Sequence, residues 1–279
     1  MHADIPSQKL MGQTVTERAA KSSTRRGPRI IGRLLFAWSW FVAGALVLFF
    51  TPPALIFGIP FKRQDWIYWW ANRGARWWLR LSGVKVNVTG REHLDPNQTY
   101  VFVANHQSYL DAAPIFAFTG RRMGMVAKKE LLDAPLLGFG MGYVNVIAID
   151  RSNRERAVET LKTVNERLRG GISFGVCPEG TRANPGEMLP FKKGAFHLAV
   201  QTGVPIVPIA LKNADVLMGR GLAEAWPGTI DMVMMPPVET SWVKDDRDLD
   251  SLVDQVQRMI MKEMGIEKIS RRRPKSTAH

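Results

Sequence analysis

His106 and Asp111 are the two side chains whose types and spacing best fit proton transfer. They lie in the segment Asn105–Asp111, directly after an apolar run, Tyr100–Ala104, that predicts a strand. Histidine exchanges a proton near neutral pH, and a carboxylate can hold its second ring nitrogen. Five residues along a regular helix place two side chains about 140° apart, so the pair cannot meet within one helix. We therefore expect His106 in a turn and Asp111 at the start of the next helix, as a catalytic pair or as a structural hydrogen bond.

A second polar segment, Pro178–Arg182, follows another apolar run, Ile172–Cys177, that predicts a buried strand. Gly180 allows the backbone to turn there and to present amide N–H groups to an anion. Arg182 can bind a phosphate group through two parallel hydrogen bonds. The segment therefore predicts an anion site, although a simple turn with a surface arginine would also fit these residues.

Both segments must be positioned by a larger domain. From Val84 onward, short apolar runs alternate with helical stretches, which is typical of an α/β or α+β domain. A capping box at Ser152–Glu155 predicts the start of a helix that ends before Gly170. Further strands are predicted at 145–149 and 205–211, and further helices at 194–202 and 249–264. Strand ends are where α/β proteins form their sites, which is where His106 falls.

The stretch Leu34–Phe61 contains no charged residue. We expect Pro52 and Pro53 to break it, so that the chain turns near them and returns. Arginines and lysines on both flanks favour placing both ends on the cytoplasmic side, which a re-entrant hairpin satisfies better than a single true span, although both stay open. Residues 62–82 predict an interfacial helix with a tryptophan stripe, although a buried helix with a tryptophan-rich face would give the same pattern.

Charge and cysteine content exclude several classes of protein. The net charge is +13, but it is concentrated outside residues 81–261, which sum to zero. This distribution favours an anionic membrane surface over nucleic acid as a partner. The lone Cys177 excludes a disulfide framework and a thiolate-rich metal site.

Four ordered blocks give the chain a resemblance to a known family. It resembles the 1-acylglycerol-3-phosphate acyltransferases, also called lysophosphatidate acyltransferases, whose first and third blocks are N-H-x-x-x-x-D and F-P-E-G-T-R. Cys177 stands where the family usually has Phe, so we expect altered packing there. The four matching blocks are 105–111, 149–151, 176–182 and 204–209, with weaker matches at 127–131 and 191–194.

The resemblance implies an α/β fold of the glycerolipid acyltransferase type, with a mostly parallel or mixed sheet flanked by helices and preceded by a membrane-embedded helical hairpin. It implies acyl transfer from acyl-CoA or acyl-carrier protein to the sn-2 hydroxyl of lysophosphatidate, without an acyl-enzyme, a metal or a cofactor. His106 would be the general base, Asp111 would orient it, and amides near Gly180 would stabilise the oxyanion. The acceptor would be bound by Lys128, Arg151, Glu179, Thr181 and Arg182, unless Glu179 instead holds the turn.

The expected organisation follows from the same resemblance. A basic tail (1–29) would precede the membrane-associated hairpin (30–82), the acyltransferase domain (83–268) and a second basic tail (269–279). The protein would lie at the cytoplasmic side of the cell membrane, which is the inner membrane in a Gram-negative cell. Two alternatives stay open: the same chemistry on another acceptor, such as lyso-ornithine lipid or another lysophospholipid, or a non-enzymatic membrane-binding protein.

Overall fold

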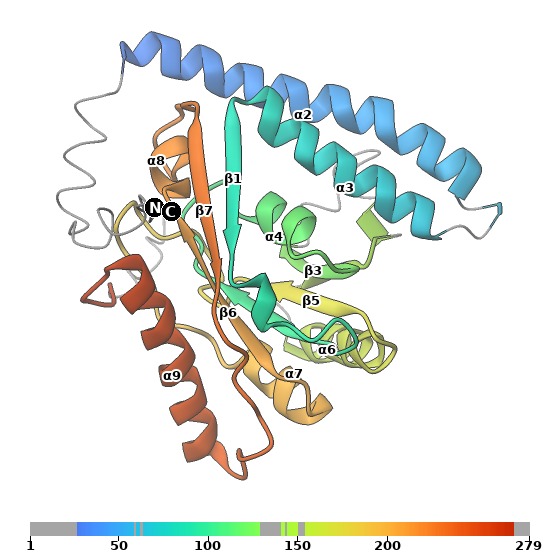
Figure 1. The fold of residues 1–279 in the computed structure, drawn as a ribbon, viewed down its shortest axis with the longest axis vertical. Helices are drawn as coiled ribbons and strands as arrows, with labels where there is room; N and C mark the ends of the chain where they lie inside the picture. The colour runs from blue at the N-terminus through green and yellow to red at the C-terminus, as the bar shows by residue number, and fades with distance from the viewer. Residues whose placement is uncertain are drawn as a thin grey trace, which may run out of the picture.

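The fold is a seven-stranded sheet with helices on both faces and a pair of long helices across one end (Figure 1). The computed structural model describes residues 27–58, 60–61, 64–128, 141–142, 144–149 and 154–270. The strands are β1 (Val84–Thr89), β2 (Val101–Ala104), β3 (Met123–Lys128), β4 (Val146–Ile149), β5 (Ser173–Val176), β6 (Ile206–Lys212) and β7 (Gly228–Met234).

The sheet is mixed, as the resemblance implied. Its strand order is β1-β7-β6-β2-β5-β3-β4. Strands β2 to β6 are parallel to one another, whereas β7 pairs antiparallel with β6 and parallel with β1. The carboxyl ends of five strands therefore meet at one edge, with β2 and β5 as direct neighbours near the middle. This is the edge at which open α/β sheets form their sites.

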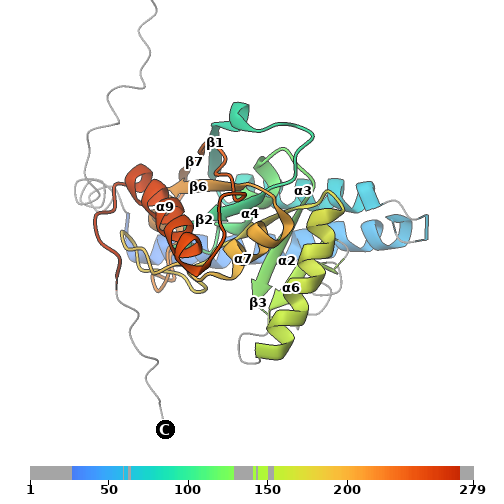
Figure 2. The same cartoon turned by 90° about the horizontal axis from the view of Figure 1, so that it is seen from below.

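Alternating side chains divide the core into two layers. Tyr100, Phe102 and Ala104 face one layer, whereas Val101 and Val103 face the other, as the period of two in a strand requires. The first layer is covered by α3 (Gln64–Leu81), α4 (Ala112–Phe118) and α8 (Ala214–Met218). The second is covered by α6 (Arg154–Arg169), α7 (Gly194–Thr202) and α9 (Asp246–Met264), which Figure 2 shows along the same side of the sheet.

Most of the helices and strands predicted from the sequence are present in the structure with similar bounds. The helix at 194–202 is confirmed with the same bounds, and α7 ends at Gly203, whose φ of 69° is the left-handed conformation typical of a helix C-terminus. Strands β2, β4, β5 and β6 lie within one residue of the predicted ranges or inside them. The final helix begins earlier than predicted, because the Asp245 carboxylate accepts hydrogen bonds from the Arg247 and Asp248 amides and caps it.

The N-terminal pair consists of α2 (Arg29–Gly58) and α3, which lie side by side (Figure 1). The prediction that Pro52 and Pro53 end the first helix is wrong, because α2 continues through both to Gly58. Proline fixes φ at a helical value, so a helix can continue through it where packing offsets the lost N–H donor and the clash of the ring with the preceding turn. Phe50, just before the two prolines, packs on Trp70 of α3 with ring centroids 5.2 Å apart and holds this part of α2 in place.

Polar contacts also join the two helices. The Trp78 indole donates to the Ser39 carbonyl oxygen at 3.0 Å, and the Trp38 indole donates to the Leu81 carbonyl oxygen at 3.0 Å. α2 is long and apolar enough to cross a membrane by length and composition. Many of its large apolar side chains are exposed, as are Trp66, Trp69 and Trp77 of α3.

Candidate active site

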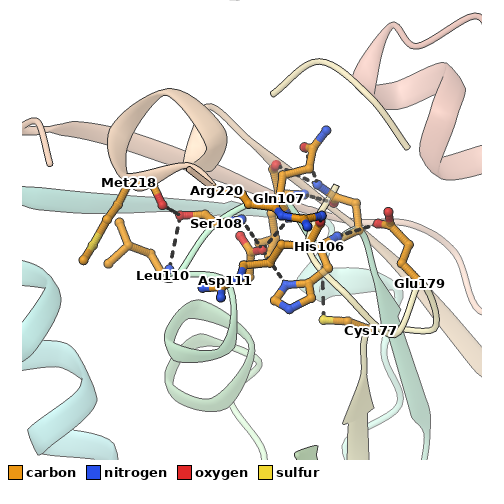
Figure 3. Close-up of polar contacts among 12 residues, drawn as sticks. His106, Gln107, Ser108, Leu110, Asp111, Cys177, Glu179, Met218 and Arg220 are labelled. Atoms are coloured by element: carbon orange, nitrogen blue, oxygen red, sulfur yellow. Dashed lines mark hydrogen bonds and ion pairs between the residues drawn. The ribbon is translucent and has the colours of Figure 1, made fainter. Parts of the chain in front are cut away.

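His106 and Asp111 meet in the turn between β2 and α4. His106 is the second residue after β2, and Asp111 immediately precedes α4. His106 Nδ1 and Asp111 Oδ2 lie 2.9 Å apart, and Figure 3 shows the ring and the carboxylate facing each other. The predicted arrangement, with the histidine in a turn and the aspartate opening the next helix, is confirmed.

The same Asp111 oxygen fixes the turn. Oδ2 also accepts hydrogen bonds from the amides of Gln107 and Ser108, each at 2.8 Å. Since this oxygen accepts from two backbone amides, the His106 Nδ1 is the donor in the third contact. A neutral ring then carries its lone pair on Nε2. Asp111 is fully buried, whereas 28% of the His106 side chain is exposed, so the ring can reach a substrate while its orienting carboxylate cannot.

Glu179 joins the turn after β5 to the turn after β2. Its Oε1 accepts from the His106 amide at 2.7 Å, and its Oε2 accepts from the Leu189 amide at 2.8 Å. The side chain is buried, and burial raises the pKa of its carboxyl to about 8 against the opposing effect of these two amides. Glu179 therefore fixes the backbone of His106, which is the turn-holding role considered for it.

The backbone at Gly180 has the left-handed conformation that favours glycine, with φ at 72°. A Cβ atom there would lie 3.0 Å from Lys192 Cε and Nζ. The Gly180 amide donates to the Cys177 carbonyl oxygen at 3.2 Å, so this N–H is engaged within the turn. The oxyanion role expected for amides near Gly180 stays a prediction. Thr181, the next residue, is exposed.

Arg182 lies beside the turn that holds His106. Its guanidinium carbon is 3.6 Å from the ring centroid of Tyr109. Its carbonyl oxygen accepts from the Arg220 guanidinium at 2.5 Å, and the amide of the next residue, Ala183, donates to the His106 carbonyl oxygen at 2.8 Å. The predicted anion-binding arginine and the predicted base therefore lie in adjoining turns.

Of the other two predicted basic residues, Lys128 lies in the part of the chain that the structure describes. Lys128 is the last residue of β3, which pairs with β5, and β4 pairs with β3 in turn. The backbone of Lys128 therefore lies at the same sheet edge as the turn with Glu179. Arg151 lies outside the described residues. Cys177 packs against the apolar layer under α4, with Sγ 4.0 Å from the Asn105 carbonyl oxygen, in the role of a small apolar side chain.

Three residues near the site were not predicted from the sequence. Gln107 donates to the Glu187 carbonyl oxygen at 2.5 Å and ties the loop after Arg182 to the turn. The Arg220 amide donates to the Gln107 carbonyl oxygen at 3.3 Å, which places a second guanidinium beside Arg182. Tyr109 stacks under Arg182. Arg220 lies between two glycines, in a segment with no other sequence signal.

Comparison with known proteins agrees with this geometry. Residues 85–212 match the family model described as Acyltransferase. The 1-acyl-sn-glycerol-3-phosphate acyltransferase alpha of Bos taurus is 38% identical over 182 residues, which are 65% of this chain and 63% of the relative. The 1-acyl-sn-glycerol-3-phosphate acyltransferase of Limnanthes alba is 34% identical over 177 residues, 63% of this chain and 61% of the relative. The match therefore covers less than two-thirds of either relative.

A solved structure shares the fold. The 1-acyl-sn-glycerophosphate (LPA) acyltransferase PlsC from Thermotoga maritima has a TM-score of 0.71 and 27% identity, over 87% of this chain and all of that chain. The structural similarity to this PlsC covers most of this chain and therefore extends beyond residues 85–212, which match the family model. The part of the chain that matches the Acyltransferase family model, residues 85–212, carries His106, Asp111 and Arg182 and is similar to 1-acyl-sn-glycerol-3-phosphate acyltransferases.

Proposed function

We propose that this chain transfers a fatty acyl group from a thioester, acyl-CoA or acyl-carrier protein, to the sn-2 hydroxyl of lysophosphatidate, giving phosphatidate. The single observation that carries the proposal is the contact between His106 Nδ1 and Asp111 Oδ2 at 2.9 Å. It leaves Nε2 as the basic atom on a ring that solvent reaches. The curated relatives named above are 1-acyl-sn-glycerol-3-phosphate acyltransferases, which supports the choice of acceptor.

His106 and Asp111 supply the proton transfers of the reaction. His106 Nε2 removes the proton of the acceptor hydroxyl as the hydroxyl oxygen attacks the thioester carbonyl carbon. Asp111 stabilises the imidazolium that forms. The tetrahedral intermediate then expels the thiolate, which takes the proton from His106 and leaves as a thiol. No acyl-enzyme forms, and the acyl donor is a substrate, so Cys177 has no covalent role.

The acceptor phosphate is assigned to Arg182, with Lys128 and Arg151 as further cations from the ends of neighbouring strands. A guanidinium can bind a phosphate through two parallel hydrogen bonds. Thr181 is exposed in the same turn and is available to the acceptor. Glu179 is assigned a positioning role, because both of its oxygens already accept backbone hydrogen bonds.

We assign the α2–α3 pair to the cytoplasmic face of the cell membrane. The exposed apolar surface of α2 and the exposed tryptophans of α3 fit the hydrocarbon and interfacial zones. The test is flotation of the full chain with vesicles that contain or lack an anionic lipid. Replacing Trp66, Trp69 and Trp77 together by alanine should weaken flotation, and unchanged flotation would remove these side chains from the interface.

The test of the reaction uses the full chain in membranes, with radiolabelled lysophosphatidate and either acyl-CoA or acyl-carrier protein. We expect labelled phosphatidate from wild type and none above background from His106→Ala. The matched control is His197→Ala, which removes an exposed histidine of α7 and should leave turnover unchanged. Equal turnover by wild type and His106→Ala would remove His106 as the base. If lysophosphatidate gives no product, product from lyso-ornithine lipid would reassign the acceptor, and none from any acceptor would favour a binding protein.

A further inference from the structure

Tyr109 occupies the turn between His106 and Asp111, and its ring contacts parts of the chain outside that turn. Its backbone is fixed, because its amide donates to the Met218 carbonyl oxygen at 3.1 Å. Its ring is half-buried and carries the Arg182 guanidinium on one face, 3.6 Å from the ring centroid. A guanidinium at this distance from an aromatic ring is held by the ring quadrupole, most strongly where water is excluded.

Two rings from α2 hold the Tyr109 ring. Phe36 meets it edge-on with centroids 5.9 Å apart, and Trp40 meets it edge-on at 5.7 Å. Phe36 and Trp40 also pack edge-on with each other at 6.2 Å. We call Phe36, Trp40 and Tyr109 the aromatic cluster. Edge-on contacts at these separations are favourable aromatic geometry, so the cluster restricts the orientation of Tyr109.

The rest of the protein keeps α2 in this place. Trp40 packs on Trp78 of α3 at 6.1 Å, and the Gly32 carbonyl oxygen accepts from the Ala225 amide at 2.9 Å. Gly32 itself lies against Trp226, since a Cβ atom on it would be 2.7 Å from that ring. α2 is therefore held by α3 at Trp40 and by the catalytic domain at Gly32.

We propose that Tyr109 is a positioning residue for the acceptor: its ring holds the Arg182 guanidinium ready for the phosphate, and Phe36 and Trp40 of α2 hold the ring. The proposal rests on the proposed function, in which Arg182 binds that phosphate. Arginine has several rotatable bonds, so a fixed guanidinium loses less freedom when the phosphate binds. Acceptor recognition thus depends on where α2 sits, although α2 supplies no residue to the reaction.

The first test compares variants of the full chain reconstituted in vesicles, with lysophosphatidate varied at saturating acyl donor. Tyr109→Leu removes the aromatic face and should raise the KM for lysophosphatidate by about three- to thirtyfold, the range for exposed to desolvated cation–π pairs, with kcat within about twofold. Tyr109→Phe keeps the ring and should change KM by less than about twofold. Trp40→Leu should shift KM in the same direction as Tyr109→Leu. Phe41→Leu, an exposed neighbour on α2 that packs on Trp38, should not.

A second test separates the ring's electrostatics from its shape. Phenylalanine with one, two or three ring fluorines at position 109 keeps the ring's shape while progressively weakening its negative face. We expect KM to rise stepwise with the number of fluorines, whereas a purely structural ring would give a flat series. Trp40→Leu leaves every residue of the catalytic turn in place, so it tests the proposal even if Tyr109→Leu does not fold.

A double-mutant cycle with Arg182→Ala distinguishes the phosphate-binding role of Arg182 from the positioning role of Tyr109. If Tyr109 acts through Arg182, Tyr109→Leu should add almost nothing to the KM of Arg182→Ala. If Arg182→Ala leaves KM unchanged, the phosphate assignment in the proposed function is wrong. If Arg182→Ala raises KM but Tyr109→Leu does not, the phosphate assignment stands and the positioning role is wrong. Loss of kcat at constant KM in Tyr109→Leu would also overturn the positioning role, because the ring would then act through His106.

Discussion

Replacing Glu179 by glutamine should destabilise the protein even though the two side chains have nearly the same shape. Each carboxyl oxygen of Glu179 accepts one backbone amide, from His106 at 2.7 Å and from Leu189 at 2.8 Å, and both oxygens keep acceptor capacity when the group is protonated. Glutamine has one acceptor oxygen and one NH₂ group, so one of the two amides must face a donor. A buried donor left without an acceptor costs about 1–3 kcal/mol, and we expect a loss of that size in the free energy of unfolding.

The measurement is urea unfolding of purified Glu179→Gln in detergent, beside wild type. Glu187→Gln is the matched control, because Glu187 lies in the following loop and its side-chain carboxylate accepts an exposed hydrogen bond from Asn184 at 2.9 Å. The control should stay within about 0.5 kcal/mol of wild type. The kcat of Glu179→Gln should also fall if the unpaired amide is that of His106. An unfolding free energy equal to wild type would refute the view that both oxygens are needed as acceptors.

Three further predictions concern the same turns and the sheet. Burial raises the pKa of Glu179 to about 8 from 4.5, so between these pH values the folded chain retains a proton that the unfolded chain releases. The free energy of unfolding should therefore fall as the pH rises from 4.5 to 8. A titration of the urea midpoint against pH should show this fall for wild type and a flatter curve for Glu179→Gln. Asp111→Asn should lower kcat by about 10²–10⁴-fold in steady-state assays with unchanged far-UV ellipticity, because a neutral amide in place of the carboxylate beside His106 Nδ1 does not stabilise the imidazolium; a kcat near wild type would contradict this. Gly90→Ala and Gly171→Ala both place alanine at a positive φ, of 82° and 84°, which alone costs about 1–2 kcal/mol. Gly90→Ala should cost more in thermal melts, because its Cβ would lie 1.7 Å from the Met234 carbonyl oxygen while nothing lies within 4 Å at Gly171; equal losses would contradict the clash.

The contact between His106 and Asp111 could be predicted because its geometry is local. Five residues separate the two, the strand before them is apolar, and the helix after them begins at the aspartate. The helix at Gly194–Thr202 is local in the same sense, since Gly203 ends it with a left-handed φ of 69°. Short-range spacing and terminating residues were sufficient in both cases.

Contacts between distant segments could not be predicted. No strand is predicted from the sequence at β1 or β7, because β1 is only half-buried and pairs with β7, more than 100 residues away. Tyr109 gave no signal, since the rings that touch it come from α2 and its cation from Arg182. The helix break expected at Pro52 and Pro53 does not occur, because the packing of Phe50 on Trp70 of α3, which proline chemistry alone does not reveal, holds α2 in place.

The strand order has a consequence for the sequence of events during synthesis. β1 pairs with β7 alone, and the contact from Asn87 to Asp231 joins residues 144 positions apart. At about 5–20 residues per second, a ribosome needs roughly 7–30 s to make that interval. During this time the α2–α3 pair has left the ribosome, while the strand that follows it has no partner. The N-terminal helices are therefore synthesised well before β7 is available to pair with β1, so the sheet that joins them to the catalytic domain can be completed only after both helices are made.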